Sequence, residues 1–178
     1  MKRLTNKQLT LKPQDLMVLM KLISLGEKPS TYGELAAALG MSSSEVHASI
    51  ARARAARLVN VENDRPAVVR SALKEFLLYG AKYAFPPTMG TQTRGLPTAY
   101  AAPPLAGRVT QPNEPPPVWP DPRGEQRGVG FQPLYPTVPA AARRDSSLYE
   151  LLALFDAIRA GAARERQIAG QLLSERLA

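Results

Sequence analysis

The stretch from Leu35 to Val59, LAAALGMSSSEVHASIARARAARLV, contains the pattern that decides the expected fold of this chain. Apolar residues repeat at three- and four-residue spacing on both sides of Gly40, which predicts two helices separated by a turn. Glycine tolerates a positive φ, so Gly40 can end the first helix sharply. Ser42 stands where an N-cap belongs, and Glu45 three residues later predicts a capping box for the second helix. The stretch therefore predicts a helix-turn-helix.

The second predicted helix has two different faces. Val46, Ile50 and Ala53 recur at helical spacing and are expected to face the first helix. The opposite face carries small or hydrogen-bonding side chains, which suits a helix that enters the major groove of DNA. The residues expected to contact DNA, at base edges or phosphates, are Ser42, Ser43, Ser44, His47, Ala48, Arg52, Arg54 and Arg57.

The pattern L-A-x-x-L-G-M-S-x-S-x-V-x-x-x-I-x-x-x-x-x-x-x-L-V resembles the DNA-binding motif of winged-helix bacterial transcriptional regulators, most closely the MarR type. The resemblance covers about residues 13–61 and implies that the second helix reads the major groove. Arg57 stands where that family commonly has glycine before the wing. Residues 63–66, Asn-Asp-Arg-Pro, have the composition of a helix start, so we expect a stunted wing followed by a long helix to about Lys82.

The charge of the chain favours an anionic partner. Its 178 residues carry a formal net charge of +8, for which nucleic acid is the first candidate. Residues 1–82 contain 13 Lys and Arg against 7 Asp and Glu, whereas the remainder contains 10 against 8. The basic excess therefore lies with the predicted DNA-binding part. The absence of cysteine excludes disulfides and thiolate metal sites.

The middle of the chain has a different composition. Fourteen of the 17 prolines lie between Pro86 and Ser146, which predicts an extended arm rather than helices. The turn signal Asp121-Pro122-Arg123-Gly124 lies between two extended segments and is compatible with a β-hairpin near 118–134. Trp119 and Tyr135 give this arm aromatic anchors for packing against another surface.

Residues 146–178 have the pattern of a helical hairpin. Such a unit is too small to bury its apolar stripe alone, so it needs the N-terminal part, a second copy of the chain or another protein. The residues expected to contact such a partner, including the anchors of the arm, are Trp119, Tyr135, Leu148, Leu151, Leu152, Phe155 and Ile158.

These patterns predict a mainly α fold in three segments. Residues 1–83 form a helix-turn-helix domain with a winged-helix-like, stunted wing and a trailing long helix. Residues 84–145 form the Pro- and Gly-rich extended arm, and residues 146–178 form the C-terminal helical hairpin.

The predicted function is sequence-specific binding of double-stranded DNA by a homodimeric transcriptional regulator, of the repressor type. The alternative is an antitoxin or defence-locus protein that autoregulates through its DNA-binding part and binds a toxin or other protein through its C-terminal two-thirds. Catalytic sequence motifs are absent, and the single histidine, His47, has no companion ligands in the sequence pattern. We therefore expect no enzymatic activity, metal or cofactor. The sequence predicts a cytoplasmic protein with no membrane partner.

Overall fold

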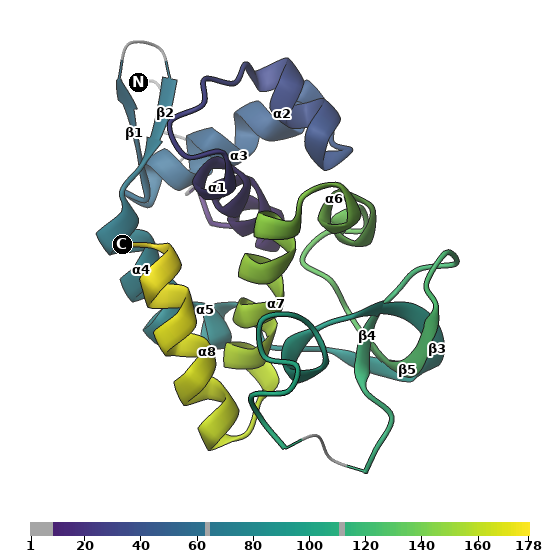
Figure 1. Ribbon diagram of the computed structural model, residues 1–178. Coiled ribbons are helices and arrows are strands. Elements are labelled where there is room, and N and C mark those ends of the chain that lie inside the picture. The colour runs from purple at the N-terminus through teal and green to yellow at the C-terminus, as the bar shows by residue number, and fades with distance from the viewer. Residues whose placement is uncertain (1–8, 63–64, 111–112) are drawn as a thin grey trace, which may run out of the picture.

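The computed structural model describes residues 9–62, 65–110 and 113–178 (Figure 1). In chain order the elements are α1 (Pro13–Leu25), α2 (Tyr32–Leu39), α3 (Ser43–Ala55), β1 (Val59–Glu62), β2 (Arg65–Val68), α4 (Arg70–Glu75), the π-helical turn η1 (Phe76–Gly80), α5 (Ala81–Ala84), β3 (Met89–Pro97), the 3-10 turn η2 (Ala99–Ala101), β4 (Pro117–Pro120), β5 (Gln126–Phe131), α6 (Val138–Arg144), α7 (Ser146–Ala160) and α8 (Ala163–Arg176).

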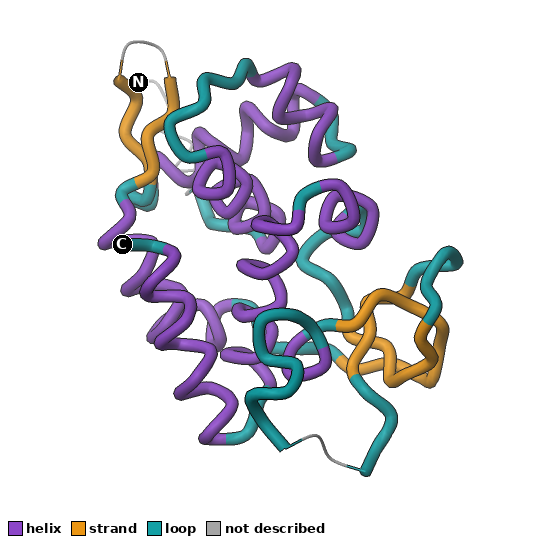
Figure 2. Tube along the Cα trace, viewed as in Figure 1, coloured by secondary structure: helices purple, strands orange, loops and turns teal. Residues whose placement is uncertain are grey.

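The prediction of a mainly α fold with a helix-turn-helix layout is wrong, because the chain is α+β. Of the described residues, 53% are helical and 16% lie in strands. The strands form two separate sheets, the two-stranded sheet β1–β2 and the three-stranded sheet β3–β4–β5 (Figure 2). The period-2 signal of these strands is weak because most of them are short and rich in proline and glycine, which obscured them in the sequence.

The local geometry from α1 to α3 follows from the sequence signals. Gly40 ends α2 in the left-handed region, with φ 65° and ψ 34°, as predicted. The side chain of Ser42 accepts a hydrogen bond from the backbone N–H of Glu45, at 3.1 Å, and so caps α3. Val46, Ile50 and Ala53 of α3 are buried against α1 and α2. These parts of the prediction are confirmed.

The region after α3 differs from the prediction. Arg65 and Pro66 belong to strand β2, which pairs antiparallel with β1 so that Pro66 faces Val61. The expected helix start and stunted wing are therefore wrong for these residues, and residues 63–64 lie outside the described part. Helical structure begins only at Arg70 and continues through η1 to Ala84. Proline is acceptable in β2 because a two-stranded sheet consists of edge strands.

The middle segment folds into a sheet that closes on itself. β3 pairs antiparallel with both β4 and β5, whereas β4 and β5 pair parallel. The predicted turn is present, because the backbone N–H of Gly124 donates to the carbonyl of Asp121 at 2.9 Å. The predictions of an antiparallel β-hairpin near 118–134 and of an extended arm are wrong, because β4 and β5 run parallel and both also pair with β3.

Glycines make this closure sterically feasible. A Cβ on Gly128 would lie 1.9 Å from the carbonyl oxygen of Pro116, and a Cβ on Gly124 would lie 2.4 Å from the backbone of Gly95. The strands approach each other more closely than any side chain permits, and this requirement explains the glycine content of a segment that resembles a linker in composition.

Helix α7 is the centre of the molecule. It contacts α1, α5, α6, α8 and η2, and every residue from Leu151 to Ile158 is buried (Figure 1). The stripe predicted to require a partner is therefore covered by the chain itself: Leu148, Leu151, Leu152, Phe155, Ile158 and also Trp119 are at most 3% exposed, and Tyr135 is half-buried against the same core. One hydrophobic core thus spans all three predicted segments.

A buried polar junction joins the three-stranded sheet to α7. The fully buried carboxylate of Asp156 accepts hydrogen bonds from Trp119 Nε1 at 2.6 Å and from Thr98 Oγ1 at 2.8 Å, and it pairs with Arg159. Arg159 also lies over the rings of Phe131 and Phe155. Because each polar atom has a partner, the junction fixes the sheet on the helix at specific points. In the part of the chain described, the helices lack the length and apolar character needed to cross a membrane.

Candidate nucleic-acid interface

The outward face of α3 is a stripe of small and hydrogen-bonding side chains. Ser44, His47, Ala51 and Arg54 are exposed and recur at three- and four-residue spacing, so they lie on one side of the helix. The stripe contains no carboxylate. Ser42 and Ser43 are exposed at the start of the helix, and Ala48 is half-buried at the edge of the stripe. The structure thus brings most of the predicted contact residues together on one surface.

His47 is held in place by an aromatic neighbour. Its ring stacks on that of Tyr32, with the centroids 4.0 Å apart and an interplanar angle of 30°. Tyr32 is the first residue of α2, where Thr31 and Glu34 form a reciprocal capping box. The hydrogen bonds from Thr31 lower the pKa of Glu34. A stacked imidazole loses little further side-chain freedom when it contacts a ligand, which favours a role at an interface.

Arg52 does not lie on this face, although the sequence analysis expects it to contact DNA. Its side chain is buried between α3 and α1, where Nη2 lies 2.6 Å from Asp15 Oδ1 and 2.7 Å from Glu45 Oε1. Nε donates to Asp15 Oδ2 at 2.9 Å and Nη2 to Ser49 at 3.1 Å. The expectation that Arg52 contacts DNA is therefore wrong. A helical position gives the face of a residue only approximately, and a long side chain can turn toward a buried carboxylate.

The same network alters the N-terminus of α3. Glu45 does not return a hydrogen bond to Ser42, so the predicted capping box is half-formed. Its carboxylate instead accepts from Arg52 and from Gln14 Nε2, the latter at 3.1 Å. The hydrogen bond from Arg52 lowers the pKa of Glu45, and the Asp15 carboxylate raises the pKa of Arg52. These contacts fix α3 on α1 and so hold the outward stripe rigidly.

Two exposed arginines lie where α3 ends. Arg54 is in the last turn of the helix, and Arg57 follows it with a positive φ of 61°. That backbone region is unfavourable for a residue with a Cβ, and glycine is the usual occupant. Arg57 allows the chain to turn from α3 into β1, as glycine would, and places a cation next to the hairpin.

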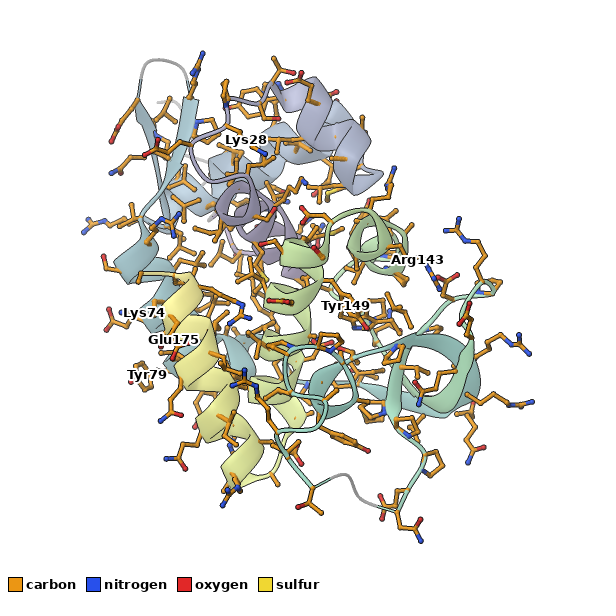
Figure 3. The ribbon with its side chains drawn as sticks, viewed as in Figure 1. Lys28, Lys74, Tyr79, Arg143, Tyr149 and Glu175 are labelled. Atoms are coloured by element: carbon orange, nitrogen blue, oxygen red, sulfur yellow. The ribbon has the colours of Figure 1, made fainter. Side chains whose placement is uncertain are left out.

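Two further exposed cations, which are not among the predicted contact residues, lie beside the β1–β2 hairpin. Lys28, in the connector after α1, and Arg65, at the start of β2, are both exposed and line one cavity of about 330 Å³ together with Arg70 and the acidic Glu27. Lys28 lies between the β1–β2 hairpin and α2 (Figure 3). Arg65 is not among the expected contacts because the sequence pattern of residues 63–66 predicts a helix start there, whereas Arg65 begins strand β2. A prediction of a hairpin there would have placed it at the tip.

The exposed cations of this region form no ion pair with a described carboxylate, a property that they share with exposed arginines elsewhere, such as Arg94, Arg108 and Arg127. Within the described ranges, no carboxylate lies within ion-pair distance of Lys28, Arg54, Arg57 or Arg65. By contrast, Arg52, Arg143, Arg159 and Arg176 all pair with acidic residues. Cations without internal partners are available to an external anion.

The described part of the chain has no group of three or more acidic or histidine side chains placed to hold a metal ion. Comparison with known protein families, with curated proteins and with solved structures finds no match to this chain.

Proposed function

We propose that this protein is a transcriptional regulator that binds double-stranded DNA, with the outward face of α3 in the major groove. The observation that carries the proposal is the carboxylate-free stripe of Ser44, His47, Ala51 and Arg54 on a helix fixed by the buried Arg52 network. A helix about 10–12 Å in diameter fits a major groove about 12 Å wide. Small residues such as Ala51 allow its backbone to approach the base edges.

The surrounding cations support the same proposal. Arg54 and Arg57 lie at the end of α3, and Arg65 on the hairpin and Lys28 in the connector are further exposed cations of the kind that contact phosphates. The resemblance of residues 13–61 to the DNA-binding part of MarR-type regulators agrees with this assignment. The alternative function, capture of a toxin or other protein by the C-terminal two-thirds, loses its main support, because the residues assigned to that contact are buried in the chain's own core.

The experiment starts from the full chain and a pool of random duplexes, from which bound sequences are selected and amplified. Fluorescence anisotropy then compares the enriched duplex with a scrambled one across a salt series. We expect an enriched site and an affinity that falls with salt. We expect Arg54→Ala to weaken binding to both duplexes and to reduce the salt slope by about one.

The matched control is Arg127→Ala, which removes an exposed arginine from β5, in the three-stranded sheet. It should leave both the affinity and the salt slope unchanged. Failure to enrich any sequence, together with salt-independent binding to the scrambled duplex, would show that the protein is not a DNA-binding regulator.

A further inference from the structure

The helical segment from Arg70 to Ala84 presents aromatic side chains to solvent. Tyr79 and Tyr83 are 69% and 76% exposed, the highest values among the large hydrophobic residues of the described chain. Tyr79 lies in the π-helical turn η1 and stands at the outer edge of the molecule (Figure 3). Two exposed tyrosines on one helical face are uncommon on a surface without a partner, since aromatic residues are enriched where proteins associate.

A shallow groove lies beside Tyr79, which forms part of its wall together with Glu75. It has a volume of about 560 Å³ and is lined mainly by apolar groups, among them Leu58, Ala72, Phe76 and Gly80. A Cβ on Gly80 would lie 2.9 Å from Phe76 Cδ2, so the absence of a side chain there allows the Phe76 ring to fold back. The surface therefore carries both a projecting ring and a groove that could receive one.

Tyr79 lies between an acidic and a basic residue of its own helical segment, and Arg166 and Glu175 of α8 contribute one charge of each sign to the groove on its Lys82 side. Glu75 precedes Tyr79 by one helical turn and is exposed, and Lys82 follows it on the other side, with Nζ 4.9 Å from the centre of the Tyr83 ring. If two copies of this segment packed antiparallel about a two-fold axis near Tyr79, the order Glu75, Tyr79, Lys82 would run in opposite directions in the two copies. Glu75 of each copy would then lie beside Lys82 of the other, which gives two ion pairs from a single arrangement.

We propose that this face, consisting of Glu75, Tyr79, Lys82 and Tyr83, is the interface of a homodimer. Tyr79 of each copy packs into the groove beside Phe76 of the other, and Glu75 pairs with the Lys82 of the other copy. A second copy fits better than an unrelated protein because one surface supplies the knob, the groove and both charges. The inference goes beyond the proposed function, since the dimer needs no DNA.

The test is the molar mass of the full chain in solution, measured by light scattering after size exclusion in the absence of DNA. We expect a mass twice that of the 19.3 kDa chain. Glu75→Lys and Lys82→Glu should each raise the dissociation constant at least about tenfold, because each places like charges together. The double variant E75K/K82E should restore the dimer, since it re-forms both pairs with the charges exchanged.

Glu125→Lys and Arg127→Glu form the matched control, because they reverse an exposed acid and an exposed base near and on β5, away from this helix (Figure 1). They should not change the molar mass. Tyr79→Glu should give a monomer with an unchanged unfolding transition, since the side chain is largely exposed. A monomeric parent protein, a dimer indifferent to the single variants, or a double variant that stays monomeric would each overturn the proposal. None of these outcomes bears on whether the protein binds DNA.

Discussion

Arg52 and Asp15 form a two-point ion pair beneath the outward face of α3, with Nη2 2.6 Å from Oδ1 and Nε 2.9 Å from Oδ2. The pair joins α3 to α1 across 37 residues of sequence. Asp15 is fully buried and also accepts a hydrogen bond from the backbone N–H of Lys12, at 2.9 Å. The position of the candidate DNA-binding helix therefore depends on an ion pair whose carboxylate, that of Asp15, is completely shielded from solvent.

Removal of one partner of this pair should destabilise the protein strongly. Asp15→Ala leaves the Arg52 guanidinium buried with only Glu45 as a counter-charge, and we expect a loss of about 3 kcal/mol in the free energy of unfolding. Urea denaturation followed by circular dichroism measures it. Arg54→Ala, two residues further along α3 but exposed, is the control and should change stability by less than about 0.5 kcal/mol. Equal losses for the two variants would contradict the assignment of Arg52 to the interior.

Arg57 should show a conflict between stability and binding. Arg57→Gly relieves the left-handed backbone and is expected to stabilise the fold by about 1 kcal/mol, yet it removes a cation from the proposed interface. The midpoint temperature of thermal unfolding should therefore rise, while the affinity for DNA should fall. Arg57→Lys retains both the strain and the charge, so it should change neither measurement appreciably. If the glycine variant binds DNA as tightly as the parent, Arg57 does not contact the phosphates.

The three-stranded sheet should tolerate no side chain at Gly124. A Cβ there would lie 2.4 Å from the backbone of Gly95, which is not a flexible group that can move aside. We expect Gly124→Ala to destabilise the protein by about 1–3 kcal/mol, the usual range for overpacking. Gly33→Ala in α2 is the matched control, because its added Cβ meets only Thr31 Oγ1 at 3.9 Å and should be neutral or stabilising. Chemical denaturation of the two variants compares them directly.

Asp145 should make the stability depend on acidic pH. Burial alone raises the pKa of this carboxyl, but the hydrogen bonds from Lys21, the backbone of Leu148 and Ser24 together lower it below its usual value. The stabilisation is therefore fully present above the unfolded pKa of about 3.9 and is lost as the pH falls through the lower folded pKa. Asp145→Asn should be less stable at neutral pH and should flatten the decline in this acidic window, measured by thermal unfolding between about pH 5 and pH 2. A parallel decline in both proteins would exclude Asp145 as its source.

The sequence predicts those parts of the fold that depend on neighbours within a few residues. The left-handed Gly40, the Ser42 cap and the buried Val46 and Ile50 all follow from local spacing, and the structure confirms them. The capping role of Glu45 does not follow, because its side chain binds Gln14, which lies 31 residues earlier.

The other incorrect predictions concern contacts between residues that are far apart in the sequence. The sequence pattern does not identify what covers the apolar stripe of α7, because α1, which packs against it, lies more than a hundred residues earlier in the chain. The closed sheet has the composition of a linker because its glycines allow strands that are distant in sequence to approach closely. Such glycines produce no local periodicity that a sequence pattern could reveal. Within the candidate site, the stripe on α3 was predictable, whereas the burial of Arg52 and the contribution of Lys28 were not, since both depend on which helix or strand packs alongside.

The central place of α7 also sets the order in which this protein can become compact during its synthesis. A nascent chain that has reached Arg144 already contains α1, the candidate DNA-binding helix and the three-stranded sheet, but not the helix that fills the space between them. The hydrogen bonds from Lys21 and Ser24 of α1 to Asp145, and from Trp119 to Asp156, cannot form before these acidic residues are synthesised. Synthesis of α7 therefore has to precede the burial of the apolar face of α1, and until α7 is present that face stays uncovered in the growing chain.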